Sequence, residues 1–237
     1  MTSLYLLLDG LTVLFPLALS FDKKVAFYKS WKYLIFGFLL VGIPFIIWDV
    51  IFTKIGVWGF NPDYLTGINL YNLPIEEVLF FVVVPFACTF IYACVKAYFP
   101  KLRLTGFNRI FYAMLVIYAI AIMILGFTGY YSTIAGFLAI ASIPILGKLK
   151  VNLRFLPLSF LIALIPFFIV NGILTGSGID APVVWYKNAE NAGIRFFTIP
   201  IDDVAYAWTL IAGNIAVYQY FMERSVKKKP KHKKRKK

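Results

Sequence analysis

The sequence predicts an all-α integral membrane protein, a bundle of seven transmembrane helices. Of its 237 residues, 61% are hydrophobic and 15% are charged, and the apolar residues gather into runs near the roughly 20 residues that a helix needs to cross a bilayer. Basic residues recur in alternate connections between these runs, and the two halves of the chain carry similar motifs. These three observations together predict two parallel three-helix repeats that a fourth helix joins.

Seven apolar segments account for the seven predicted helices. The first of them lacks a basic leader, carries Asp9 inside its apolar run and has no convincing small-residue cleavage site after it, so we expect a helix that is retained. The predicted spans are Leu4–Ser20, Tyr33–Thr53, Ile75–Phe99, Ile110–Phe127, Tyr130–Gly147, Phe155–Thr175 and Ile201–Glu223.

Basic residues follow the first, third, fifth and seventh spans, which places them on one side of the membrane. By the positive-inside rule, the N-terminus then lies outside and the C-terminus in the cytoplasm, in a multi-pass protein of the cell (cytoplasmic) membrane. The lysine-rich tail is expected to attract anionic lipids. Because it lacks the interleaved aromatic residues of a single-strand binding platform, we expect no nucleic-acid partner. The basic connections hold Lys23, Lys24, Lys29 and Lys32, then Lys101, Arg103 and Arg109, and then Lys148, Lys150 and Arg154.

An internal repeat organises the chain. The segment Ile43–Ile51 resembles Ile165–Ile173, and the acidic segment Leu73–Val78 resembles Ile199–Val204. The predicted domains are a first repeat (1–105, helices 1 to 3), a linking helix (106–129), a second repeat (130–224, helices 5 to 7) and a basic cytoplasmic tail (225–237). Two similar units of this kind are expected to face each other across a pseudo-twofold axis and to line a common cavity with equivalent residues.

Two adjacent acids open a membrane helix in each half, Glu76 with Glu77 and Asp202 with Asp203. Acids in a first helical turn can simply favour the helix dipole and bond free backbone N–H groups. Adjacent residues, however, point about 100° apart on a helix. We therefore expect at least one acid of each pair to face the interior of the bundle, where carboxyl groups are costly and usually functional.

Further polar and aromatic residues are predicted at the same membrane level. A buried carboxyl group without a cation beside it tends to keep its proton, and a pair of acids can divide the roles of proton donor and proton acceptor. Aromatic residues make up 19% of the chain; they either form an interfacial belt or shield a cationic intermediate. The supporting residues that we single out are Asp9, Asp49, Asn171, Trp48, Trp58 and Trp185.

A resemblance to a known family rests on these motifs. The pattern Pro74-x-Glu76-Glu77-x-x-x-Phe81, with Phe45-x-x-Trp48-Asp49 and Val57–Pro62 before it, resembles the membrane-integral lycopene cyclases of bacteria, archaea and fungi. In that family the two related halves are separate subunits or one fused chain, and this sequence resembles the fused form from Leu4 to about Glu223. Its second acidic pair is Asp-Asp, so each side chain there is one methylene group shorter.

The resemblance implies an intramolecular lyase or isomerase that cyclises the ψ end groups of lycopene to β-ionone rings. It implies catalytic roles for Glu76 and Glu77 as the acid centre with Asp202 and Asp203 as partners. Asp49, Asn171, Trp48, Trp58, Trp185 and Phe81 would support them. The reaction transfers no hydride, so we expect no cofactor and no metal, and the sequence has no dinucleotide-binding fingerprint. The expected partners are lycopene or a related acyclic carotenoid from the bilayer, and other carotenoid enzymes.

Three other functions remain open at this point. A carotenoid 1,2-hydratase would share the first protonation step but would capture the cation with water. A small membrane transporter or proton channel would also use intramembrane carboxyl groups and internal repeats. A purely structural assembly subunit would use none of the acids chemically.

Overall fold

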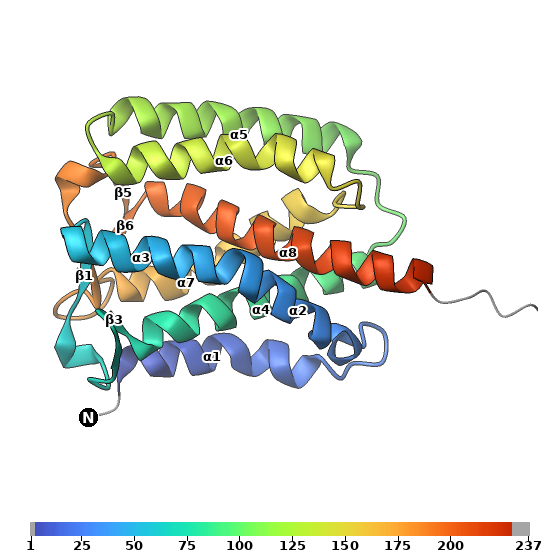
Figure 1. Ribbon diagram of the computed structural model, residues 1–237, viewed down its shortest axis with the longest axis horizontal. Coiled ribbons are helices and arrows are strands. Elements are labelled where there is room, and N and C mark those ends of the chain that lie inside the picture. The colour runs from blue at the N-terminus through green and yellow to red at the C-terminus, as the bar shows by residue number, and fades with distance from the viewer. Residues whose placement is uncertain (1–2, 229–237) are drawn as a thin grey trace, which may run out of the picture.

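The computed structural model describes residues 3–228, with side chains up to residue 225, and this part of the chain is mostly helical (Figure 1). The helix Phe27–Ile55 is composite: it begins with the 3₁₀ segment η1, and the π-helical segment η2 interrupts its α-helical part. The helical elements are α1 (Leu4–Leu19), η1 (Phe27–Tyr33), α2 (Leu34–Gly37), η2 (Phe38–Gly42), α3 (Ile43–Ile55), η3 (Pro62–Tyr64), α4 (Ile75–Tyr98), α5 (Thr105–Leu125), α6 (Tyr130–Lys148), α7 (Leu156–Leu174), η4 (Asn188–Glu190) and α8 (Asp202–Lys228).

The helices have the length and composition of membrane helices. Within residues 3–228, five are long and apolar enough to cross a bilayer: Phe27–Ile55, Ile75–Tyr98, Thr105–Leu125, Tyr130–Lys148 and Leu156–Leu174. Helix α1 is apolar but has only 16 residues, and α8 is not among the five. The chain is thus a helical membrane protein, and the number of seven crossings stays a prediction. Large apolar side chains on the outer surface suit a lipid environment, among them Phe15, Ile110, Ile117 and Ile124.

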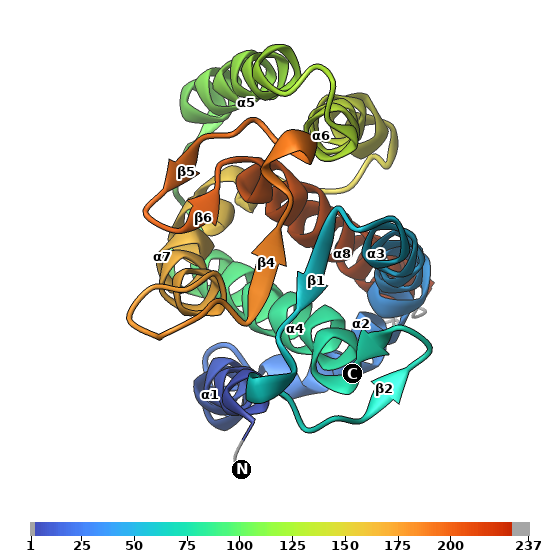
Figure 2. The ribbon, with the colours of Figure 1, turned by 90° about the vertical axis from the view of Figure 1, so that its left-hand side faces the viewer.

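Short strands at one end of the bundle depart from the predicted all-α fold. They form three antiparallel pairs in the connections that precede α4 and α8 (Figure 2). Strands of two or three residues are too short to leave a periodic pattern in the sequence, which is why the helical prediction missed them. The pairs are β1 (Trp58–Phe60) with β4 (Val184–Tyr186), β2 (Asn69–Leu70) with β3 (Leu73–Pro74), and β5 (Arg195–Phe196) with β6 (Ile199–Pro200).

The strands reveal how closely the two halves of the chain match. The small pairs β2–β3 and β5–β6 have the same register, displaced by 126 residues. Each of them ends in a residue with a left-handed backbone before the strand that leads into the helix, Tyr71 (φ 60°) and Phe197 (φ 54°). The pair β1–β4 takes one strand from each half, with Gly59 opposite Trp185 at its centre. The pseudo-twofold axis therefore passes through this pair.

Helices α4 and α8 lie side by side in the middle of the bundle and interlock the two halves (Figures 1 and 2). Helix α4 packs against α1 of its own half and α7 of the other half, while α8 packs against α6 of its own half and α2 of the other. Both central helices begin at the end of the bundle that carries the strands. Their first turns, with the two acidic pairs, are thereby brought beneath the β1–β4 pair.

A glycine on α6 permits the close approach of the linking helix α5, and this contact can be tested. A Cβ atom on Gly136 would lie 2.8 Å from the Ala119 carbonyl oxygen and 2.5 Å from the Met123 side chain. We expect Gly136→Ile to force α5 and α6 apart and to destabilise the protein by about 1–3 kcal/mol, as overpacking does. Thermal unfolding in detergent measures the effect. Gly147→Ile, on the same helix but with open space around it, is the matched control, and equal melting temperatures for the two variants would contradict this packing.

Candidate active site

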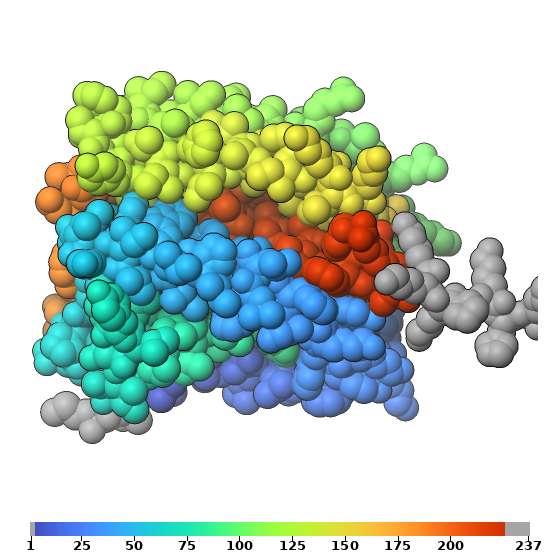
Figure 3. Space-filling view, in the orientation of Figure 1, coloured from blue at the N-terminus to red at the C-terminus, as the bar shows by residue number. Residues whose placement is uncertain are grey.

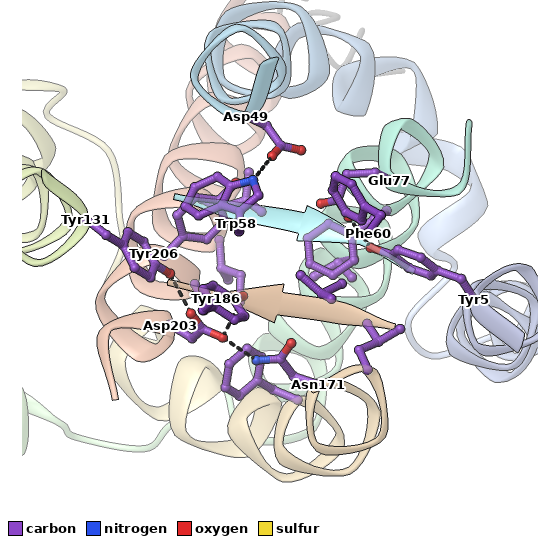
Figure 4. A pocket seen from close by; sticks show the side chains of 18 residues that line it. Tyr5, Asp49, Trp58, Phe60, Glu77, Tyr131, Asn171, Tyr186, Asp203 and Tyr206 are labelled. Atoms are coloured by element: carbon purple, nitrogen blue, oxygen red, sulfur yellow. Dashed lines mark hydrogen bonds between the residues drawn. The ribbon is translucent and has the colours of Figure 1, made fainter. Parts of the chain in front are cut away.

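A cavity lies between the two halves, at the first turns of α4 and α8 and beneath the β1–β4 pair (Figure 4). Most positions that line it come in equivalent pairs, one from each half. The pairs are Tyr5 with Tyr131, Asp49 with Asn171, Trp58 with Val184, Phe60 with Tyr186, Glu77 with Asp203, Phe80 with Tyr206, and Val84 with Leu210. The structure thus forms the common cavity that the repeat predicts.

The second acid of each pair faces this cavity and receives a hydrogen bond from a tyrosine. The Tyr5 hydroxyl donates to Glu77 Oε2 over 2.6 Å, and the Tyr131 hydroxyl donates to Asp203 Oδ1 over 2.6 Å. Each tyrosine stands in the first turn of the first helix of its half, 72 residues before its acid. The two acids are therefore held in the same way by equivalent parts of the two repeats.

Asp203 accepts two more hydrogen bonds, both from neutral groups. Asn171 Nδ2 donates to Asp203 Oδ2 over 2.7 Å, and the Tyr186 hydroxyl donates to the same oxygen over 3.1 Å (Figure 4). Burial, and then the Asp203 carboxylate, raise the pKa of the Tyr186 hydroxyl well above its ordinary value, so this phenol keeps its proton and can donate it. Three hydrogen-bond donors thus surround the Asp203 carboxyl group. Because an ionised carboxylate can only accept hydrogen bonds, this arrangement favours the ionised form of Asp203.

Glu77 has a different neighbour. Asp49, at the position that corresponds to Asn171, lines the cavity together with Glu77, and the two carboxyl groups interact electrostatically. Trp58 Nε1 donates to Asp49 Oδ1, and Thr53 Oγ1 lies 3.4 Å from the same oxygen. Asp49 Oδ2 is buried and receives no hydrogen bond from a donor in the described residues. The first half therefore contributes two carboxyl groups to the cavity, and the second half contributes one.

The first acid of each pair, Glu76 or Asp202, does not line the cavity, although the resemblance implied catalytic roles for all four acids. Glu76 Oε1 accepts hydrogen bonds from Ser3 Oγ (2.8 Å) and from the Thr66 backbone N–H (2.7 Å). Asp202 Oδ1 accepts from Ser132 Oγ, and the Ala192 N–H donates to both carboxylate oxygens. The physical reason is the 100° turn between adjacent helical residues, which sends the two acids to different surroundings. Through these hydrogen bonds, Glu76 holds the connection that precedes α4 to the start of that helix, and Asp202 does the same at the start of α8.

The aromatic residues that were predicted to support the site differ in their position relative to the cavity. Trp58 lines the cavity. Trp48 packs behind it, with its ring centroid 6.5 Å from that of Trp58. Phe81 is fully buried in a cluster with Phe45 and Leu210 and does not line the cavity, and Trp185 is 44% exposed on the outer side of the strands. Of these aromatic residues, only Trp58 lines the cavity together with the carboxyl groups.

Three tyrosines of the cavity, Tyr5, Tyr131 and Tyr206, were not singled out from the sequence. The regular distance from Tyr5 to Glu77 and from Tyr131 to Asp203 is a signal that a residue-by-residue alignment of the two halves would have shown. Tyr186 and Tyr206 left no comparable signal, because their counterparts Phe60 and Phe80 have no hydroxyl group. Asp9, which we expected at this level, is buried on α1 but does not line the cavity.

The groups that can carry a full charge in the described lining of the cavity are acids: Asp49, Glu77 and Asp203. None of the described residues that line it is a lysine, an arginine or a histidine. An ion pair joins Lys187 and Glu190 in an outer connection. Among the side chains that the structure describes, no three metal-ligating groups are arranged around a metal site. Because a buried charge without a partner is costly, the three cavity carboxyl groups depend on neutral hydrogen-bond donors and on each other.

The fold and the cavity define a class: an integral membrane protein that encloses carboxyl groups from two related halves in an apolar, aromatic-walled site. Comparison with protein families gives the particular family. The model of the lycopene cyclase family matches residues 2–95 and 128–221, which is most of the chain, and its two matched segments are displaced by the same 126 residues as the structural repeat. The chain belongs to the lycopene cyclase family and is thus an enzyme of carotenoid cyclisation. Comparisons with curated proteins and with solved structures gave no match.

The anchoring role of Glu76 leads to a prediction about stability. We expect Glu76→Ala to lower the free energy of unfolding by about 1.5–3 kcal/mol, because it removes charge-assisted hydrogen bonds to Ser3 and to the Thr66 backbone. Thermal unfolding of the purified protein measures this loss. Glu77→Gln is the matched control, since its amide can still interact with Tyr5 and anchors no loop. A Glu76→Ala protein as stable as Glu77→Gln would show that the loop does not depend on this carboxyl.

Proposed function

We propose that this protein is a lycopene β-cyclase, which converts the ψ end groups of lycopene to β rings and so forms γ-carotene and β-carotene. The observation that carries the proposal is the convergence of carboxyl groups from both halves, Asp49 and Glu77 with Asp203, on one cavity walled by aromatic rings. Family membership makes carotenoid cyclisation the reaction class. The carboxyl groups supply the acid and the base that this particular cyclisation needs.

The proposed reaction is an isomerisation in which one proton is gained and one is lost. A carboxylic acid of the cavity protonates C2 of the terminal double bond, which leaves a tertiary cation at C1. The electron pair of the 5,6 double bond forms the C1–C6 bond and moves the positive charge to C5. A carboxylate then removes the proton from C6, and its electron pair forms the 5,6 double bond of the β ring. The reaction involves no net oxidation or reduction and requires no redox cofactor.

The cavity walls suit a cationic intermediate. Rings of Trp58, Phe60 and Tyr206 line the site together with the carboxyl groups, and aromatic faces attract cations in desolvated surroundings. Apolar walls also limit access of water, which would trap the cation as an alcohol. This second property separates a cyclase from a carotenoid 1,2-hydratase, the nearest alternative.

Residues of both halves form a groove on the lipid-facing surface, and we propose that the hydrocarbon substrate enters the protein here. The lining residues of this groove come from η2 and α3 on one side and α6 on the other, together with Thr209 and Gly213 of α8. Helix α8 is visible between these two sides in Figure 3. Phe45 lines this groove, and its ring lies 4.9 Å from that of Tyr206, which lines the cavity. These two rings stand between the groove and the cavity, so a carotenoid dissolved in the bilayer would displace them to reach the acids without passing through water.

The remaining parts of the proposal concern the membrane. We propose seven crossings with the strand end outside, in the cytoplasmic membrane, because the basic connections gather at the opposite end of the bundle (Figure 1). The basic tail would then bind anionic lipids; most of it, 229–237, lies outside the described residues. Association with other carotenoid enzymes would suit a substrate that is confined to the bilayer.

A carboxyl substitution tests the proposed chemistry. We expect Glu77→Gln to lower the rate of lycopene cyclisation by about 10²–10⁴-fold, the usual contribution of a general acid or base. The purified protein in liposomes that contain lycopene provides the assay, with chromatography of the pigments as the measurement. Asp63→Asn, an exposed outer-loop acid at the same end of the molecule, is the control and should keep the activity of the unchanged protein.

The same assay separates the alternatives. Hydroxylated acyclic products would identify a hydratase instead of a cyclase. Absence of any carotenoid product from correctly inserted protein, together with proton flux across the liposomes, would favour a transporter or channel. Full cyclisation by Glu77→Gln would exclude this residue from the chemistry.

A further inference from the structure

The two halves of the cavity differ at one decisive pair of positions. Asp49 on α3 and Asn171 on α7 are equivalent in the repeat, and each approaches the cavity acid of its own half. In the second half, the Asn171 amide donates a hydrogen bond to Asp203. In the first half, a carboxyl group instead of an amide meets Glu77.

This difference decides where a proton can reside. An ionised carboxylate has acceptors only, so two carboxyl groups can hydrogen-bond to each other only when one of them is protonated. Asp49 and Glu77 are both buried in one cavity without a cation among its described lining residues, so one proton held between them lowers the cost of burying two charges. Asp49 Oδ2, which receives no hydrogen bond from a donor group in the described residues, has room for this proton. An asparagine side chain carries no titratable proton and supplies an N–H donor, which favours the ionised form of its partner.

Two further differences between the halves act in the same direction. Phe60 and Phe80 of the first half correspond to Tyr186 and Tyr206 of the second. The second half thus offers hydroxyl groups where the first half offers hydrocarbon, and one of them donates to Asp203. The surroundings of Asp203 stabilise an anion more strongly than those of Glu77.

We propose that Asp49 and Glu77 together hold the proton that is delivered to C2 of the substrate, and that Asp203 is the base that removes the proton from C6. The Asp-to-Asn difference between the repeats fixes these roles. This assignment rests on the proposed cyclisation. In one turnover the Asp49–Glu77 pair loses one proton and Asp203 gains one, so uptake of a solvent proton by the pair and release of a proton to solvent by Asp203 restore the enzyme without any oxidant or reductant.

The substitution Asp49→Asn tests the assignment, because it gives the first half the residue of the second. The amide oxygen can still accept the hydrogen bond of Trp58 Nε1, and the amide nitrogen can donate to Glu77 as Asn171 does to Asp203, so the packing is kept. We expect kcat to fall by about 10²–10⁴-fold while KM for lycopene stays within about twofold. A purely structural role of Asp49 predicts an unchanged kcat, and that result would overturn the proposal.

The reverse substitution provides a second variant. Asn171→Asp adds a carboxyl group to the cavity but takes the amide donor from Asp203. The new carboxyl group and Asp203 would then share a proton, and a protonated Asp203 cannot act as the base. We expect kcat to fall here as well. If the number of acids in the cavity were what mattered, the added carboxyl would leave the rate unchanged or raise it, and either result would contradict the assigned roles.

Infrared spectroscopy provides a readout that does not depend on activity. A protonated carboxylic acid has its own C=O stretching band, and the difference spectrum of the unchanged protein minus Asp49→Asn should show the loss of one such band. Asp203→Asn should leave it in place. No band in the first difference spectrum would overturn the shared proton, even in a protein that cyclises lycopene. If the unchanged protein does not act on lycopene, the proposed function fails, while the spectra still decide whether Asp49 and Glu77 share a proton.

Discussion

The burial of acidic groups without any cationic partner is the constraint on which this structure depends. Asp49, Glu77 and Asp203 are each less than one tenth exposed, and their cavity has no lysine, arginine or histidine among its described lining residues. A fold can accept such groups only when it supplies hydrogen-bond donors or protons in their place. The tyrosines at the start of α1 and α6, the indole of Trp58 and the amide of Asn171 supply those donors.

The arrangement of the repeats explains how the donors come to lie in the right places. Because α4 and α8 begin side by side at one end of the bundle, a single pattern of loop, proline and two acids builds both walls of the cavity. The first acid of each pair holds the preceding loop and the second lines the cavity, so the duplicated motif both fixes the loops and places carboxyl groups in the cavity. Divergence at Asp49 and Asn171, and at two phenylalanine–tyrosine pairs, then makes the two walls chemically different.

Much of this organisation could be predicted from the sequence, and the limits have physical causes. Long apolar runs predicted the helices from α1 to α8 within a few residues, since the bilayer fixes the length of a spanning segment. The matching acidic motifs predicted a shared cavity. The orientation of each acid depends on the first residue of the helix, which sequence patterns set only to within a few residues, so the separation of Glu76 from Glu77 needed the structure. Tyr5 and Tyr131 lie at helix starts 72 residues before their acids, and no local pattern connects positions so far apart.

Cyclisation in deuterium oxide tests most directly whether buried acids start the reaction. Exchangeable carboxyl protons become deuterons in this solvent, whereas the hydrogen at C6 of lycopene does not exchange. The account predicts a product that has gained one deuterium at C2 for each ring formed and has lost the hydrogen of C6, as mass spectrometry and NMR would detect. A cyclic product without deuterium at C2 would contradict it, because the ring would then have closed without a proton from the protein.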